Sequence, residues 1–138
     1  MARHVLITIA ACMLVSACGP APRSATSPAD QPTPRLVEPQ PGMDKVKPVS
    51  WDRFDVAKGG RTLHVFWGSG PAPCSMLDHV ELVQSQETVT VTLYEGSDPK
   101  VPAGAPCPTI LIPKTTTVQL DTPVGDRKVV DGAPAGSS

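Results

Sequence analysis

The chain contains no asparagine, few aromatic side chains and no cluster of basic residues. Without asparagine it offers no acceptor for N-linked glycans. Aromatic residues make up only 4% of the chain, so at least one tryptophan is expected in the core. The lysines and arginines are scattered, which argues against nucleic acid as a partner because a nucleic-acid backbone requires a clustered basic surface.

Long apolar runs are also scarce, and the main one lies near the N-terminus. It covers Val5–Val15, about a dozen residues against the roughly 20 that a membrane-spanning helix needs. Arg3 precedes it, and the small residues 16–17 separate it from Cys18. This pattern predicts an export signal over residues 1–17 and disfavours a permanent membrane span.

The segment Val15–Cys18 resembles the lipobox of bacterial lipoproteins. The resemblance implies cleavage before Cys18 and acylation of that cysteine, which anchors the protein to the lipid bilayer on the outer face of the cytoplasmic membrane. A single acyl chain binds a membrane only marginally, so stable anchoring requires several. The alternative is an ordinary secretory signal cut near Ala17, which leaves Cys18 as a free thiol.

The remaining cysteines predict a disulfide. Cys12 is removed with the signal and Cys18 is assigned to lipid, which leaves Cys74 and Cys107 in an oxidising compartment. Closing this loop of about 34 residues stabilises a domain by roughly 3 to 4 kcal/mol in the chain-entropy model. A redox or metal pair is the alternative, but the spacing is far from C-x-x-C and no third ligand lies beside either cysteine.

Composition divides the mature chain into three parts. Residues 18–48 carry eight prolines and few large apolar side chains, so we expect the lipidated cysteine and a proline-rich linker there. A proline-rich docking ligand is the alternative for this segment. A globular domain is predicted over residues 49–132, and a flexible tail of small residues over 133–138.

The predicted domain alternates apolar and polar residues with a period of two. Thr88–Glu95 is the clearest strand, and it forms a hairpin with His79–Gln84 through a short polar connection. A brief helical turn is the candidate for Ser75–His79. The other expected strands are Trp51–Val56, Thr62–Trp67, Thr109–Ile112, Thr115–Leu120 and Arg127–Val130. About seven short strands predict an all-β fold, an immunoglobulin-like sandwich or, as the alternative, a small β-barrel.

This domain is similar to small actinobacterial cell-envelope lipoproteins of uncharacterised function. The elements that carry the resemblance are Cys74, Val80–Leu82, Val89–Leu93, Cys107, Thr116–Leu120, Pro123, Gly125–Arg127 and Val130–Gly132. The resemblance implies location in the cell envelope and a disulfide-linked β domain, and it implies no activity.

Catalytic and metal-binding patterns are weak. Ser69, with His64 or His79 as base, lacks the G-x-S-x-G form that places a nucleophile between strand and helix. Asp78 and His79 are neighbours whose side chains should point to opposite faces of a strand, so they should not chelate one ion. The sequence therefore predicts a non-enzymatic protein without catalytic residues, metal or cofactor.

Five side chains are candidates for ligand binding. Trp51, Trp67 and Tyr94 could stack on a ligand if exposed, His64 lies near them in sequence, and Arg127 could bind an anion or pair with an acid such as Asp131. We expect a monomeric envelope lipoprotein that presents its domain to an envelope protein or a cell-wall glycan.

Two other functions remain as alternatives. One is a catalytic or accessory role in the hydrolysis of envelope polymers, with side chains drawn from Asp52, Asp55, His64 and His79. The other is a purely structural coat lipoprotein, which predicts no concave site.

Overall fold

The computed structural model of the protein describes residues 32–137. The predicted signal peptide, Cys12, the predicted lipidated Cys18 and the linker up to residue 31 lie outside the described residues. Within the described range, no helix has the length and apolar character to cross a membrane.

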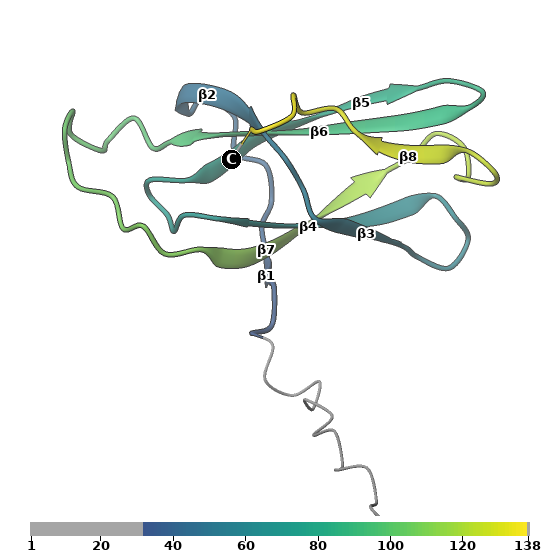
Figure 1. The fold of residues 1–138 in the computed structure, drawn as a ribbon, viewed down its shortest axis with the longest axis horizontal. Helices are drawn as coiled ribbons and strands as arrows, with labels where there is room; N and C mark the ends of the chain where they lie inside the picture. The colour runs from purple at the N-terminus through teal and green to yellow at the C-terminus, as the bar shows by residue number, and fades with distance from the viewer. Residues whose placement is uncertain (1–31, 138) are drawn as a thin grey trace, which may run out of the picture. The chain divides into compact units, whose positions relative to one another are not determined.

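The described chain forms two β-sheets that lie in separate layers (Figure 1). The first sheet has the strand order β1-β7-β4-β3, and the second has the order β2-β6-β5 with β8 also paired to β6. The strands are β1 (Arg35–Leu36), β2 (Asp44–Val49), β3 (Arg53–Val56), β4 (Thr62–Ser69), β5 (Met76–Gln84), β6 (Thr88–Ser97), β7 (Ile112–Gln119) and β8 (Lys128–Asp131). The predicted all-β sandwich is confirmed, and the alternative of a closed barrel is wrong.

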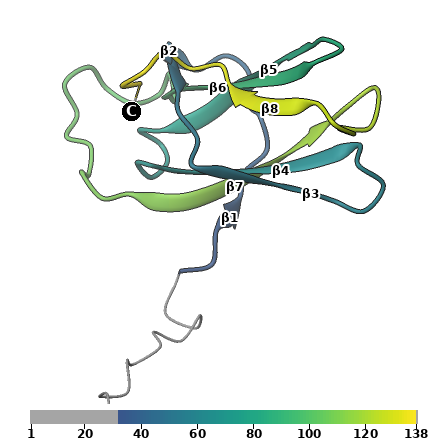
Figure 2. The same cartoon turned by 45° about the vertical axis from the view of Figure 1, so that its right-hand side comes forward.

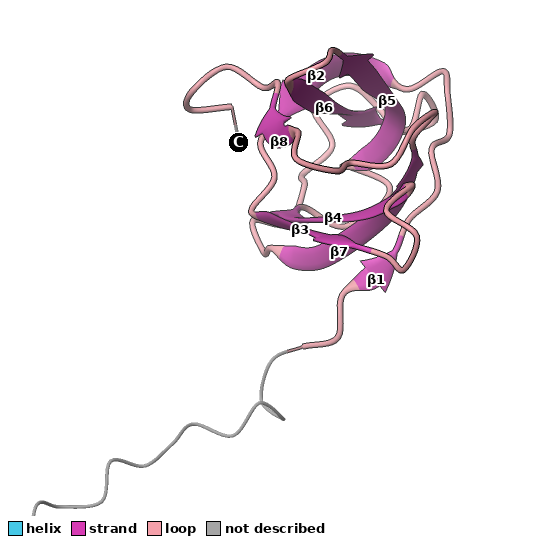
Figure 3. Ribbon diagram, turned by 90° about the vertical axis from the view of Figure 1, so that its right-hand side faces the viewer, coloured by secondary structure: helices cyan, strands magenta, loops and turns pink. Residues whose placement is uncertain are grey.

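Figure 3 shows the two sheets facing each other as separate layers. Period-two alternation along the strands determines which side chains form the core between them. Leu63, Val65 and Trp67 in β4 and Val89, Val91 and Leu93 in β6, alternate residues of each strand, are fully buried apolar side chains. Successive side chains of a strand point to opposite faces of its sheet, so these apolar residues face the other sheet. The buried apolar cluster is Val49, Leu63, Val65, Trp67, Leu77, Val89, Val91, Leu93, Val118, Leu120 and Val124.

In the first sheet, β4 pairs antiparallel with β7 from Thr62 opposite Gln119 to Ser69 opposite Ile112. The strand predicted at Thr115–Leu120 corresponds to β7, which runs through Pro113, but the strand predicted at Thr109–Ile112 is wrong, because only Ile112 is in β7 and residues 109–111 belong to a loop. Proline fits there because β1 begins to pair with the other edge of β7 only at Lys114, so no ladder hydrogen bond is lost at Pro113.

In the second sheet, the long strand β6 organises three partners. β5 pairs antiparallel along one edge of β6. The opposite edge is shared, since β2 pairs antiparallel with its C-terminal half and β8 pairs parallel with its N-terminal half. Gly96 permits the close approach of β2, because a Cβ atom at this position would lie 2.5 Å from the carbonyl oxygen of Asp44.

Three boundaries predicted from the sequence need correction. Part of the predicted linker, residues 32–48, belongs to the domain and supplies β1 and most of β2. The predicted helical turn at Ser75–His79 lies mostly in β5, because pairing with β6 extends to Met76. The predicted tail returns to the domain, where the carbonyl of Ser137 accepts a hydrogen bond from the amide of Ser50.

The predicted disulfide is present between Cys74 and Cys107, whose Cα atoms are 5.9 Å apart. It joins the connection between β4 and β5 to the loop 98–111. This loop lies at the end of the sandwich opposite the β5–β6 hairpin, as Figures 1 and 2 show. We call this end the disulfide end.

Candidate functional site

One side of the sandwich, between the edges of β7 and β5, is incompletely covered. None of the described strands pairs with the outer edge of β5, and β1 pairs with β7 only at Lys114 and Thr115. We call this the open side. Unpaired strand edges present backbone donors and acceptors that another extended chain can use.

Residues 37–43, which we call the strap, cross the open side from β1 toward β2. The amide of Val37 donates to the carbonyl of Thr115, and the amide of Gln40 donates to the carbonyl of Leu77, both at 2.8 Å. The strap thus contacts both sheets through a small number of backbone hydrogen bonds, and Val37 packs against the core.

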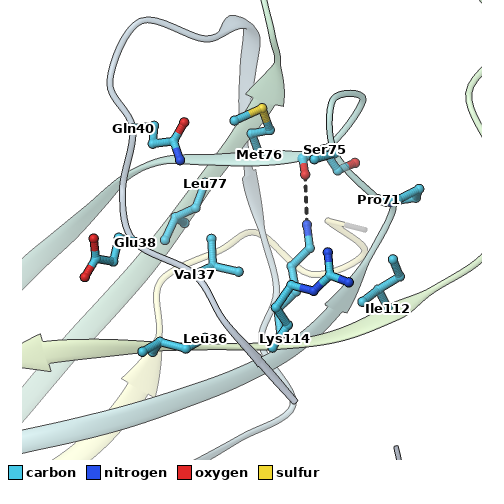
Figure 4. A pocket seen from close by; sticks show the side chains of 12 residues that line it. Leu36, Val37, Glu38, Gln40, Pro71, Ser75, Met76, Leu77, Ile112 and Lys114 are labelled. Atoms are coloured by element: carbon cyan, nitrogen blue, oxygen red, sulfur yellow. Dashed lines mark hydrogen bonds between the residues drawn. The ribbon is translucent and has the colours of Figure 1, made fainter. Parts of the chain in front are cut away.

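A cleft of about 390 Å³ lies beside the strap at the disulfide end of the open side. Its lining consists of Arg35–Glu38, Gln40, Pro71, Ala72, Ser75–Leu77, Ile112 and Lys114. Figure 4 shows Lys114 reaching across this cleft to the carbonyl of Ser75. The volume is sufficient for one or two side chains of a partner.

A second cleft of about 380 Å³ is lined by Leu36–Pro39, Thr116 and Thr117. Both clefts share Leu36–Glu38, so the strap and the end of β1 lie between them. The Thr116 hydroxyl is buried and has no hydrogen-bond partner within residues 32–137. Buried hydroxyl groups without a partner are uncommon in proteins, and this one lies on a residue that lines the cleft.

A buried ionic network connects the two sheets beneath the cleft. The Oε1 atom of Glu95 in β6 accepts hydrogen bonds from Lys114 Nζ in β7 at 2.9 Å and from two groups in β4. These are Trp67 Nε1 at 3.0 Å and Ser69 Oγ at 2.8 Å. The side chains of Lys114 and Glu95 are each only 5% exposed, so the ion pair is shielded from water.

Asp78 fastens the far end of the strap to β5. Its Oδ1 atom accepts hydrogen bonds from the amides of Gly42 and Met43, each at 2.8 Å. Its Oδ2 atom contacts Nδ1 of His79 at 2.6 Å. The hydrogen bond with His79, and then those from Met43 and Gly42, hold the pKa of Asp78 below its ordinary value of 3.8, although partial burial opposes them.

The contact between Asp78 and His79 differs from the prediction that these neighbours point apart. The pairing of β5 with β6 shifts register between Leu77 and His79. Such a bulge breaks the regular alternation of side chains. Asp78 therefore lies close enough to orient the imidazole of His79.

The imidazole of His79 stacks on the ring of Tyr94, with centroids 4.3 Å apart and an interplanar angle of 11°. The hydroxyl of Tyr94 donates to Glu81 at 3.0 Å, and this hydrogen bond raises the pKa of Tyr94. The His79 side chain is 48% exposed. These residues form a partly exposed ring pair beside a carboxylate, on the outer face of the second sheet.

The two tryptophans that were candidates for ligand binding pack within the domain instead. Trp67 is 1% exposed and belongs to the core. Trp51 packs edge-to-face against Phe54 at 5.8 Å, and its Nε1 donates to the carbonyl of Val91. Trp67 enters the network below the open-side cleft through Glu95, whereas Trp51 lies in the connection between β2 and β3.

His64, Tyr94 and Arg127 do not join the tryptophans in one cluster. His64 lies on β4 opposite Asp55 and near Thr117, on the first sheet, whereas His79 and Tyr94 belong to the second. Arg127 donates to the carbonyls of Thr122, Pro123 and Val124, which closes the turn before β8. The possible pairing of Arg127 with an acid such as Asp131 is not formed among the described residues: Arg127 takes part in no ion pair, and Asp131 accepts hydrogen bonds from the amides of Trp51 and Ala133.

The catalytic alternative drew its residues from Asp52, Asp55, His64 and His79. His64 lies opposite Asp55 in the first sheet, whereas His79 lies in the second. Within residues 32–137, no three His, Cys, Asp or Glu side chains are grouped as metal ligands. No family model matches the chain, and no significant similarity to a curated protein or to a solved structure is found.

The ionic network was missed at the sequence level, although the sequence carries its signal. Glu95 continues the inward-facing positions Val89, Val91 and Leu93, and Lys114 shares the inward face of β7 with Val118. An acid and a base at inward positions of two strands predict a buried pair once the strands face each other. No comparable sequence pattern predicts the strap.

Replacing Lys114 tests the network. Lys114→Met leaves the Glu95 carboxylate buried without its counter-charge, so we expect the free energy of unfolding to fall by about 3 to 5 kcal/mol in urea denaturation. Adding Glu95→Gln should restore much of the loss, whereas Lys128→Met, at an exposed lysine, should have little effect. A loss below about 1 kcal/mol, typical of surface pairs, would contradict the role of the network.

Acid denaturation tests the role of Asp78. Its folded-state pKa lies below its ordinary value of 3.8, so its carboxylate stabilises the fold above that pH and loses this effect as the pH falls through the folded pKa. Asp78→Asn should therefore lower the thermal midpoint above pH 3.8 and match the wild type in strong acid. The exposed Asp126→Asn is the control. If Asp78→Asn lowers the thermal midpoint by the same amount at every pH, the charge of Asp78 does not contribute to stability.

Proposed function

We propose that the protein is a lipid-anchored envelope lipoprotein whose β domain binds a segment of another envelope protein along its open side. The anchor is inferred from the lipobox-like segment ending at Cys18. The observation that carries the binding role is the cleft beside the strap, which lies at the incompletely paired edges of β7 and β5.

The chemistry of the cleft favours a protein segment over other ligands. Val37, Met76 and Ile112, which are partly exposed, supply apolar surface for a side chain. Arg35 adds a positive charge and Glu38 a negative charge, and neither forms an ion pair with another described residue. An extended peptide matches this combination, because its backbone can pair with a strand edge while alternate side chains enter a cleft.

The ionic network supports binding by keeping the cleft in one shape. Lys114 lines the cleft and is fixed by Glu95 and by the carbonyl of Ser75. A rigid site loses less conformational entropy when it binds a ligand.

A cell-wall glycan is the second candidate ligand, favoured by the ring pair of His79 and Tyr94. Aromatic faces pack against apolar sugar surfaces, and Glu81 offers an acceptor for sugar hydroxyls. This surface lies outside the residues that line the open-side cleft, so the two ligands can be distinguished by position.

Site-specific photo-crosslinking in the producing cell tests the open side. A photo-crosslinking amino acid in place of Gln40, which lines the cleft, should yield a discrete adduct with one segment of an envelope protein. The same amino acid in place of Gln86, an exposed glutamine in the distant hairpin, should not yield it. Arg35→Glu should weaken the adduct.

Mass spectrometry of the adduct, followed by binding of the matching synthetic peptide, identifies the partner. Equal adducts from both positions would mean nonspecific proximity and would contradict the proposal. Absence of an adduct at residue 40, together with retention on peptidoglycan that depends on Tyr94, would favour the glycan.

A further inference from the structure

Three exposed apolar side chains lie near the start of β7, where the loop 98–111 and β1 meet it, whereas Val46, Val56 and Val83 are exposed elsewhere on the domain. The three most exposed large apolar residues between 32 and 137 are Leu111 at 75%, Leu36 at 63% and Ile110 at 60%. We call these three residues the apolar tip. Ile110 and Leu111 are neighbours in the chain, and a contiguous exposed apolar patch marks a contact site.

The chain leading to the predicted anchor enters the domain beside this tip. β1 is the first described strand and pairs in parallel with the beginning of β7. Because the two strands are parallel, the segments that precede them lie at the same end of the sheet. One of these segments is the incoming chain and the other contains Ile110 and Leu111.

The distance to the predicted anchor is short. Pro32 lies fourteen positions after Cys18, and a chain of that length spans at most about 50 Å. The strands of the domain are up to ten residues long, about 34 Å. The point where the chain enters the domain, beside the apolar tip, is therefore held within about one and a half lengths of β6 from the predicted anchor.

The loop that carries Ile110 and Leu111 is suited to a lipid surface. Residues 101–113 contain no charged side chain. Leu36 follows Arg35, an exposed basic residue that can remain at the level of lipid phosphates while its neighbour inserts. From these observations we infer that the apolar tip inserts into the outer surface of the membrane that carries the anchor.

This inference rests on the anchor of the proposed function and adds a fixed orientation. With the tip in the bilayer, the disulfide end faces the membrane and the β5–β6 hairpin points away from it. A partner that approaches the open-side cleft would then meet it close to the membrane surface. A protein partner covering the tip is the competing explanation.

Fluorescence on vesicles tests insertion. The full mature protein, purified from membranes with its lipid, carries Thr109→Cys labelled with an environment-sensitive nitrobenzoxadiazole fluorophore and is reconstituted in vesicles of phosphatidylethanolamine and phosphatidylglycerol. We expect a blue-shifted emission, and quenching by acyl-chain spin labels that is severalfold stronger than for the same fluorophore at Gln86→Cys. Ile110→Asp combined with Leu111→Asp should abolish the shift, and Val83→Asp, at another exposed apolar residue, should leave it unchanged.

The outcomes separate the inference from the anchor. If the protein floats with the vesicles but the fluorophore at residue 109 emits as in water, the tip does not insert and the anchor stands. If the protein does not float with the vesicles, both the lipid anchor and the insertion that rests on it are contradicted. Near-ultraviolet circular dichroism verifies that the aspartate variants remain folded, and an unchanged shift in a folded double variant overturns the inference.

Discussion

The Glu95 carboxylate is the main polar connection between the two sheets. It belongs to the second sheet, and its three donors, Lys114, Trp67 and Ser69, belong to the first. Burying a carboxylate and an ammonium is costly unless both are paired and hydrogen-bonded, so any slip of β4, β6 or β7 in register would leave a charge unsatisfied. The network therefore favours a single arrangement of the strands, and Lys114 extends that constraint to the backbone of Ser75, next to the disulfide.

The same network determines where the open-side cleft lies. Lys114 is the residue at which the pairing of β1 with β7 begins, and its side chain forms part of the cleft wall. The strap closes the cleft from outside and is fastened at its far end by Asp78. The wall is thus fixed by buried charges, whereas the cover is held by few hydrogen bonds. A fixed wall and a loosely held strap suit a site whose wall keeps its shape while the strap adjusts to a partner.

The sequence predicts the core strands well because their signal is local. Alternation along Val89–Leu93 and Leu63–Trp67 reveals an inward face without knowledge of the partners. The elements that the sequence misses depend on partners far away in the chain. β2, for example, consists largely of exposed residues, including Lys45 and Lys47, and forms a strand because β6 has a free edge. The high proline content of residues 32–48 obscured this pairing, and no local pattern reveals the cleft that the strap creates.

Amide hydrogen exchange of the acylated protein, measured in its native membranes and again after purification in detergent, would test the binding role of the open side most directly. If an envelope segment occupies the open side, amides of the strap and of the edges of β7 and β5 should exchange more slowly in the membranes than in detergent, whereas amides of the β3–β4 turn should not differ. Equal exchange of the open-side amides in both states would contradict it.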